Sequence, residues 1–225
     1  MTDCNSNLIL IAGAAGDLGK SLCRSFSEKG HTVIGISRKE FRPSNCEKPY
    51  FVNLSNYEQL IKTNEAIEKD FGRPRIVINS AGFYLPTAED ASNKKVYENN
   101  FLVAENLLKL YSQKLSSIEN SRIITISSID GVYPNPNSFS YSIAKSSINT
   151  LIKLYTKKYR DSLLNFDLIS PGAINTRMRE AKKEIKEDLI QVEDVSKVCL
   201  MLGSMETNVS FEEIVIYPKK FSYSN

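Results

Sequence analysis

Tyr141 and Lys145 are the residues whose types and spacing could most directly do chemistry. Four residues apart on an α-helix, they would share one face. A phenol with an ordinary pKa of about 10 exchanges protons poorly near neutral pH. A nearby ammonium favours the phenolate and lowers the pKa of the phenol, so the tyrosine could act as a general acid or base. Ser128, thirteen residues before Tyr141, could then bind the substrate oxygen beside the phenol.

The same residues also have structural interpretations. Tyr141 and Lys145 could lie on a helix surface, and Ser128 could form a turn at the end of a strand. The rest of the chain decides between these alternatives.

Composition places the chain among globular proteins with a buried core. It has 225 residues, 41% of them hydrophobic and 24% charged, which fits one large domain or two small ones. No apolar run is long enough to span a membrane, and the first residues do not resemble a signal peptide. We therefore expect a cytoplasmic protein without a membrane partner. A net charge of +3 is too small to indicate nucleic-acid binding.

Cysteine and histidine usage disfavours metal and histidine-based chemistry. Cys4, Cys23, Cys46 and Cys199 are far apart in the sequence and have no paired spacing. That pattern predicts free thiols rather than a zinc site or a disulfide framework. His31 is the only histidine, so we expect no metal site.

Strand-like and helix-like segments alternate along the whole chain. The expected strands are 8–12, 32–36, 50–52, 75–79, 122–127, 165–169 and 213–217. The expected helices are 18–28, 56–71, 94–115, 141–159 and 195–202. Continuous apolar runs are typical of parallel strands covered on both faces. Residues 1–225 are thus predicted to form one doubly wound α/β domain, with about seven parallel strands and helices on both faces.

A glycine-rich turn joins the first expected strand to the first helix. Gly13, Gly16 and Gly19 are spaced G-x-x-G-x-x-G, so the backbone could approach a pyrophosphate at the N-terminus of a helix. The alternative is a tight turn that binds nothing. Asp17 could cap the helix, but it also places a carboxylate near the expected phosphate.

The second strand runs into Ser37, Arg38 and Lys39, with no acidic residue before Glu40. An acidic residue here suits a free ribose 2′-hydroxyl, whereas arginine suits a 2′-phosphate. We therefore expect NADP(H) to be preferred, with NAD(H) possible. The alternative is a solvated basic loop.

From about Leu8 to Tyr217, the chain resembles a compact short-chain dehydrogenase/reductase. Its motifs occur in the family's order: the turn Gly13–Gly19, an Asn-Ser-Ala-Gly segment at 79–82, Asn100, Ser128, the Tyr141–Lys145 pair and a Pro-Gly segment at 171–176. The resemblance implies a Rossmann-like, NAD(P)-binding fold.

The resemblance also implies roles for these positions. Tyr141 would exchange a proton with the substrate oxygen, and Lys145 would lower the pKa of Tyr141 and bind the nicotinamide ribose. Ser128 would hold the carbonyl, and Asn100 would hold a water in a proton relay, unless it is only a polar helix residue. The implied cofactor contacts are Gly13, Gly16, Asp17, Leu18, Gly19, Ser37, Arg38, Asn53, Leu54, Asn79, Ala81, Gly82, Tyr141, Lys145, Pro171, Gly172, Ile174 and Thr176.

Three features depart from the family pattern. Ala12 replaces a threonine, Asp17 stands where a glycine is common, and only sixteen residues separate Thr176 from Glu193. A short covering segment suits an open cleft and a bulky or carrier-linked substrate, but it could also mean weak activity. We expect Phe83, Tyr84, Ile129, Tyr133 and Met178 to line the substrate pocket.

Together these features predict an NADP(H)-dependent carbonyl reductase or alcohol dehydrogenase that acts on a small-molecule carbonyl or alcohol. A non-redox dehydratase or isomerase and a nucleotide-binding regulatory protein are the alternatives. The resemblance also implies a homodimer or homotetramer that pairs through the helices at about 95–115 and 141–160.

Overall fold

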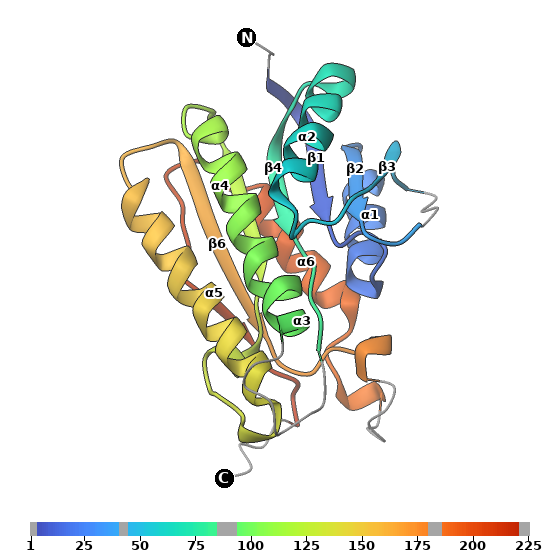
Figure 1. The fold of residues 1–225 in the computed structure, drawn as a ribbon, viewed down its shortest axis with the longest axis vertical. Coiled ribbons are helices and arrows are strands. Elements are labelled where there is room, and N and C mark those ends of the chain that lie inside the picture. The colour runs from blue at the N-terminus through green and yellow to red at the C-terminus, as the bar shows by residue number, and fades with distance from the viewer. Residues whose placement is uncertain (1–3, 41–44, 85–93, 180–185, 221–225) are drawn as a thin grey trace.

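Seven parallel strands form one sheet in the order β3-β2-β1-β4-β5-β6-β7 (Figure 1). The computed structural model describes residues 4–40, 45–84, 94–179 and 186–220. The strands are β1 (Cys4–Ala12), β2 (Thr32–Ser37), β3 (Lys48–Phe51), β4 (Arg73–Asn79), β5 (Ser121–Ile126), β6 (Leu164–Pro171) and β7 (Ile214–Ile216). The predicted doubly wound α/β fold with a seven-stranded parallel sheet is confirmed.

The strand order reverses direction between β1 and β4. From β1 the chain proceeds through β2 to β3 at one edge, then returns to pair β4 with β1 and continues to β7. The connections after β1 and β4 therefore diverge, which opens a crevice at the carboxyl ends of these strands. Ligands of open α/β sheets bind at such a point.

Helices cover both faces because successive strand residues point to opposite sides. Leu8 and Leu10 pack with α2 (Tyr57–Phe71), α4 (Val103–Leu115) and α5 (Phe139–Lys158). Ile9 and Ile11 pack with α1 (Asp17–Glu28) and α6 (Val192–Gly203). Both faces of the central strands are thus buried, which explains the continuous apolar runs.

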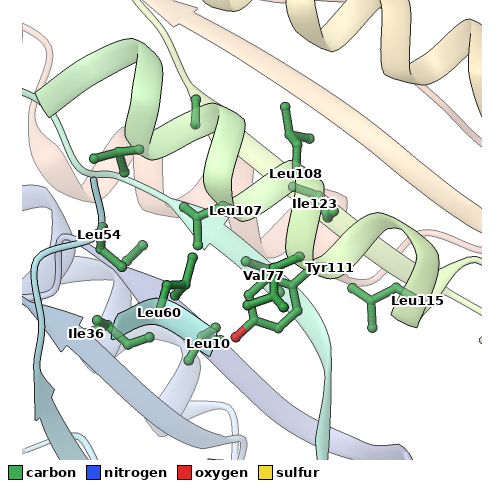
Figure 2. Packing of buried hydrophobic residues seen from close by; sticks show 14 of the residues in the cluster. Leu10, Ile36, Leu54, Leu60, Val77, Leu107, Leu108, Tyr111, Leu115 and Ile123 are labelled. Carbon is green, nitrogen blue, oxygen red and sulfur yellow. The ribbon is translucent and has the colours of Figure 1, made fainter. Parts of the chain in front are cut away.

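Figure 2 shows the core on the α4 side of the sheet, where Leu107 and Tyr111 of α4 face Leu10, Val77 and the α2 residue Leu60. Tyr111 is fully buried, and burial raises the pKa of its phenol. This packing fixes α4 against the strands whose ends form the crevice.

The predicted uninterrupted helix over 94–115 is wrong in one detail. A π-helical turn, η1 (Glu98–Leu102), separates α3 (Lys94–Tyr97) from α4. The side-chain Nδ2 of Asn100 donates to the carbonyl oxygen of Val96 at 2.8 Å, the acceptor that its backbone N–H would use in a regular α-helix. The wider turn accommodates this bond and leaves Asn100 fully buried.

Four 3₁₀ turns complete the secondary structure of the described residues: η2 (Ile129–Gly131), η3 (Pro136–Ser138), η4 (Arg177–Arg179) and η5 (Lys186–Asp188). In these residues, no helix combines the length and apolar character needed to cross a membrane.

The four cysteines are free, as predicted, but two of them meet in space. The Sγ atoms of Cys23 on α1 and Cys46 before β3 are 3.0 Å apart. Cys23 lies on α1, which packs against β2, and Cys46 lies just before β3, the strand that pairs with β2. Sequence spacing alone did not indicate this contact.

A buried ion pair joins β5 to β6. Arg122 and Asp167 are each 0% exposed, and Arg122 Nη1 lies 2.9 Å from Asp167 Oδ2. Arg122 Nη2 also donates to the backbone oxygens of Glu206 and Val209. Desolvation raises the pKa of Asp167 to about 6 despite the attraction of Arg122. The pair thus fixes the segment between α6 and β7 rather than adding much net stability.

Candidate active site

A cleft of about 750 Å³ opens at the carboxyl ends of the central strands. Its walls come from the turn after β1, the end of β2, the segment after β4, helix α5 and the segment after β6. These segments are distant in sequence and meet because parallel strands all end at the same edge of the sheet.

Gly13 and Gly19 make the floor of the cleft possible. Gly13 has φ +85°, and a Cβ there would lie 2.6 Å from the Ala81 backbone nitrogen. A Cβ on Gly19 would lie 2.2 Å from the Gly13 carbonyl oxygen. No larger side chain fits at either position without moving backbone. The turn therefore packs against the segment after β4 and leaves the N-terminus of α1 facing the cleft.

The suggestion that Asp17 caps α1 is wrong. Gly16 is the N-cap residue, in extended conformation, and Asp17 is the first residue of the helix. The Asp17 carboxylate instead accepts hydrogen bonds from the backbone nitrogen and the Nε of Arg177, each at 2.8 Å. Gly16, Asp17 and Leu18 all line the cleft.

Ser37 and Arg38 line the cleft at the end of β2. Arg38 is exposed, and its guanidinium donates to the Oδ1 of Asn99 in η1. Asn99 also lines the cleft. The Arg38 guanidinium is therefore held at the cleft wall by the Asn99 side chain.

The residues after β3 divide between cleft and surface. Leu54 lines the cleft and is 3% exposed. Asn53 is exposed, and its Oδ1 accepts from the Ser55 backbone and hydroxyl at 3.2 and 2.9 Å. Among the described residues, Asn53 is outside the cleft lining, because its side chain closes a local turn.

The segment after β4 forms the wall next to the glycine-rich turn. Asn79 is buried and accepts from the Ala81 nitrogen at 3.2 Å, while Ser80 Oγ donates to the Ala12 carbonyl at 2.7 Å. Ala81 and Gly82 line the cleft. A Cβ on Gly82 would lie 3.6 Å from Asn100 Oδ1 and 3.8 Å from Lys145 Nζ. Gly82 thus lies between two predicted catalytic residues.

Asn100 is tied to the same segment from behind. Its Nδ2 donates to the Phe83 carbonyl at 2.7 Å, and its Oδ1 accepts from the Phe83 nitrogen at 3.3 Å. These bonds hold the chain around Gly82 and Phe83 in place. Asn100 therefore lies beneath the cleft, whereas its neighbour Asn99 faces into it.

Tyr141 and Lys145 lie one helical turn apart on α5, and both line the cleft. Lys145 Nζ is 5.6 Å from the centroid of the Tyr141 ring and donates to the Ile126 carbonyl at 3.1 Å. Lys145 is 2% exposed, and burial lowers the pKa of its ammonium to about 8. The site thus places a desolvated amine beside a phenol.

Ser127 and Ser128 follow the end of β5 and differ in environment. Ser128 is half-buried and caps η2, with its Oγ accepting from the Asp130 nitrogen at 3.2 Å. Ser127 is buried, lines the cleft and donates to Asn149 Oδ1 on α5. Of the two serines, the predicted Ser128 caps η2 and is outside the lining of the described cleft, whereas Ser127 lines the cleft and connects β5 to α5.

The segment after β6 forms a further wall of the cleft. The Gly172 nitrogen donates to the Ile216 carbonyl at 2.8 Å, so Pro171 and Gly172 lie behind the cleft wall beside β7. Ile174 forms a bridge with Ile190, and Ile174 and Thr176 line the cleft. The six residues 180–185 of the predicted short covering segment lie outside the described residues.

Three of the five residues predicted to line a substrate pocket line this cleft. Phe83, Tyr84 and Met178 line the cleft, and the Tyr84 ring packs edge-on against Tyr141 with centroids 5.2 Å apart. Ile129 and Tyr133 are outside the lining of the described cleft. Ile129 is 8% exposed because it turns inward in η2, whereas Tyr133 is 50% exposed.

Sequence reasoning missed Asn99 and Arg177, which line the cleft and pair with Arg38 and Asp17. Asn99 could have been suspected from its place beside Asn100. Arg177 directly follows the Pro-Gly segment but carries no spacing signal of its own. Within the described residues, no group of three or more His, Cys, Asp or Glu side chains could hold a metal ion.

Comparisons with known proteins agree with this geometry. A family model described as short chain dehydrogenase matches residues 7–187. The chain is 23% identical to a 3-oxoacyl-(acyl-carrier-protein) reductase of Thermotoga maritima, covering 92% of this chain and 94% of the relative. It is 29% identical to a 3-ketodihydrosphingosine reductase of Bacteroides thetaiotaomicron, covering 83% and 71%.

Solved structures share the fold. The closed form of serine dehydrogenase complexed with NADP⁺ superimposes with a TM-score of 0.84 at 17% identity, covering 97% of both chains. ElxO with NADP bound gives a TM-score of 0.81 at 23% identity, also covering 97% of both chains.

Replacing Lys145 with Met is expected to stabilise the protein at pH 7. The pKa of Lys145 in the folded protein, about 8, is below the ordinary value of 10.5. Protonated Lys145 therefore costs folding free energy, in full below pH 8 and less as the pH rises toward 10.5. Lys145→Met should raise the free energy of unfolding by up to about 3 kcal/mol at pH 7, with a smaller gain at pH 10.

Urea denaturation of the nucleotide-free protein at both pH values measures this difference. Lys157→Met, an exposed lysine on the same helix, serves as the control and should show no such pH dependence. A loss of stability at both pH values would mean that the bond to Ile126 outweighs the desolvation cost.

Proposed function

Because the chain belongs to the short-chain dehydrogenase family of NAD(P)-dependent oxidoreductases, we propose that it is an NADP(H)-dependent carbonyl reductase or alcohol dehydrogenase. The observation that carries this proposal is the buried Lys145 amine beside Tyr141 in the cleft at the strand reversal. Burying an amine is unfavourable without a function or a partner that compensates. A site that combines desolvation with a phenol neighbour is suited to proton transfer.

The residues present fit a dinucleotide. Gly13 and Gly19 allow the turn to pack closely against the segment after β4 and against the start of α1. The N-terminus of α1 lines the cleft, where its N–H groups can be offered to a pyrophosphate. Arg38 would hold the 2′-phosphate of the adenosine ribose, and Leu54 would pack beside the adenine. Lys145 would bind the nicotinamide ribose, with Ile174 and Thr176 beside the nicotinamide ring. Within this assignment, Asn53, Asn79, Pro171 and Gly172 support the walls.

The bound nicotinamide would supply or accept the hydride. In the reducing direction, Tyr141 would donate its phenolic proton to the substrate oxygen, and in the oxidising direction it would remove the hydroxyl proton. The Lys145 ammonium would stabilise the phenolate that forms. Ser128 would hold the substrate oxygen beside the phenol, which requires its hydroxyl to turn from the Asp130 amide toward the cleft. Asn100 would keep the chain at Gly82 and Phe83 in the position that leaves room for the ring.

A 3-oxo compound is the substrate class to test first. Both reductases named above have a 3-oxo or 3-keto substrate in their names. Phe83, Tyr84 and Met178 would offer apolar surface to a chain attached to such a carbonyl. This substrate class goes beyond what family membership implies. It rests on the names of the two relatives and on the apolar side chains of Phe83, Tyr84 and Met178.

We also propose that the protein is a homodimer that pairs through α5 and the neighbouring α3 and η1 segment. A groove of about 740 Å³ runs along α5, and its lining is mostly apolar: Tyr97, Phe101, Pro134, Pro136, Phe139, Ile143, Leu151 and Leu154, with polar residues at 135, 142, 146, 147 and 150. Ile143 and Leu154 are 49% and 58% exposed. Exposed apolar surface of this kind is typical of association sites.

Turnover should depend on the phenol of Tyr141. Wild-type protein is expected to oxidise NADPH with an acceptor from a panel of ketones, quinones and 3-oxoacyl thioesters. Tyr141→Phe should lower kcat at least about 100-fold, because general acid–base catalysis contributes roughly 10² to 10⁴, and should leave the Kd for NADPH within about twofold. Tyr133→Phe, outside the described cleft lining, is the matched control. Unchanged turnover in Tyr141→Phe would contradict the role of Tyr141 as the proton donor. Nucleotide binding without turnover in the wild type would favour the non-redox or regulatory alternative.

Arg38→Ala should weaken the binding of NADPH more than the binding of NADH. One charge-assisted contact to the 2′-phosphate is worth about 1.5 kcal/mol, so the Kd for NADPH should rise roughly tenfold while that for NADH changes by less than about twofold. Fluorescence titration with both nucleotides measures the two constants. Lys29→Ala, which removes an exposed cation at the far end of α1, controls for net charge. If the Kd values for NADPH and NADH rose equally, Arg38 would not be a 2′-phosphate contact.

Adding charge to the groove should dissociate the dimer. Ile143→Glu with Leu154→Glu places two carboxylates on the apolar surface, and sedimentation velocity should then show a monomer. Met201→Glu on α6, where the methionine is 40% exposed, is the control and should leave the wild-type mass unchanged. A monomeric wild type would contradict the proposal.

A further inference from the structure

Asp17 presents a charge problem for the proposed function. It is the first residue of α1, directly after the N-cap Gly16, and it lines the cleft. A carboxylate here interacts well with the positive end of the helix dipole. It would also face the pyrophosphate that the same helix end is proposed to bind, and two negative groups at close range repel.

Arg177, in the segment after β6, is bound to this carboxylate. Its Nη2 and Nε both lie 2.8 Å from Asp17 Oδ1, and its backbone nitrogen donates to Asp17 Oδ2 at 2.8 Å. The side chains of Asp17 and Arg177 are 27% and 60% exposed. Both oxygens of the carboxylate are therefore used, in a contact that joins the segment after β6 to the phosphate-binding turn.

We infer that Arg177 is a positioning residue for the dinucleotide, because it neutralises Asp17 and holds the Thr176 segment beside the phosphate-binding turn. The inference rests on the proposed function. With Arg177 in place, the cleft wall at the start of α1 carries no net charge from this pair. Without Arg177, a carboxylate would stand beside the phosphates without its partner.

The contact has two separable effects. The first is charge compensation, which should depend on the negative charge of Asp17 and decrease in high salt because the pair is partly exposed. The second is attachment of the Thr176 segment through the backbone nitrogen of Arg177, which a neutral acceptor at position 17 can preserve. Removal of the Asp17 charge should therefore compensate for the loss of the Arg177 charge.

A double-mutant cycle in the full-length protein tests this dependence. The variants are Arg177→Ala, Asp17→Asn and the double variant, with isothermal titration calorimetry for NADPH, ADP-ribose and adenosine. Arg177→Ala should raise the Kd for NADPH and ADP-ribose roughly tenfold, which corresponds to about 1.4 kcal/mol. It should leave adenosine, which lacks phosphates, within twofold. Asp17→Asn should bind NADPH at least as tightly as wild type, and the double variant should bind within about threefold of Asp17→Asn.

Two further variants separate the charge of Arg177 from the size of its side chain. Arg177→Lys retains the charge without the planar fork and should recover most of the affinity, whereas Arg177→Gln should resemble Arg177→Ala. Melting temperatures check that each variant is folded, and Arg177→Gln replaces Arg177→Ala if the alanine variant unfolds. At 0.5 M salt the tenfold loss should shrink.

Three results would overturn the inference: wild-type affinity in Arg177→Ala, a double variant as weak as Arg177→Ala, or equal losses for adenosine and ADP-ribose. These differ from failure of the proposed function. If wild-type protein binds no dinucleotide, the proposed function falls and the inference falls with it. If wild type binds NADPH and Arg177→Ala binds it equally well, only the inference falls.

Discussion

The site depends on one backbone contact, between the turn after β1 and the segment after β4. Gly13 adopts φ +85° and lies so close to Ser80 and Ala81 that a Cβ would be within 2.8 Å of both residues. This approach is possible only for glycine. It sets where α1 begins and therefore where its N-terminal N–H groups face the cleft. The Ser80 hydroxyl, which donates to the Ala12 carbonyl, holds the same two segments together.

A second constraint fixes the helix that carries Tyr141 and Lys145. Asn149 on α5 accepts from Ser127 after β5 and donates to Glu213 at 3.1 Å, and Glu213 accepts from Ser170 of β6 at 2.7 Å. This chain of bonds links the ends of two strands, the helix and the entry to β7. Buried polar networks of this kind have few alternative arrangements, because each lost bond would leave a desolvated group. The orientation of α5 is therefore specified beyond its apolar packing.

The site then balances charges against burial. Lys145 is a buried amine with a pKa of about 8. Its burial lowers the stability of the fold, as is common for residues that an active site needs. Asp17 and Arg177 cancel one another at the mouth of the same cleft. Arg38 is held by Asn99 on η1. Asp17, Arg38, Lys145 and Arg177 thus each have a neighbouring group or a buried environment that restrains their charge.

The sequence by itself determined the fold class and the set of motif residues, because apolar runs, glycine spacing and Tyr-x-x-x-Lys are local patterns. The strand order came only from the tertiary structure. It did not determine which of Asn99 and Asn100 faces the cleft, because a π-helical turn set by a side-chain bond decides that. It also did not reveal the contacts of Asp17 with Arg177 or of Cys23 with Cys46. Such pairs come from segments far apart in the chain, and only the packing of α1 and the segments beside it brings them together. Tertiary structure therefore decided the partners and the burial of residues whose types the sequence had already supplied.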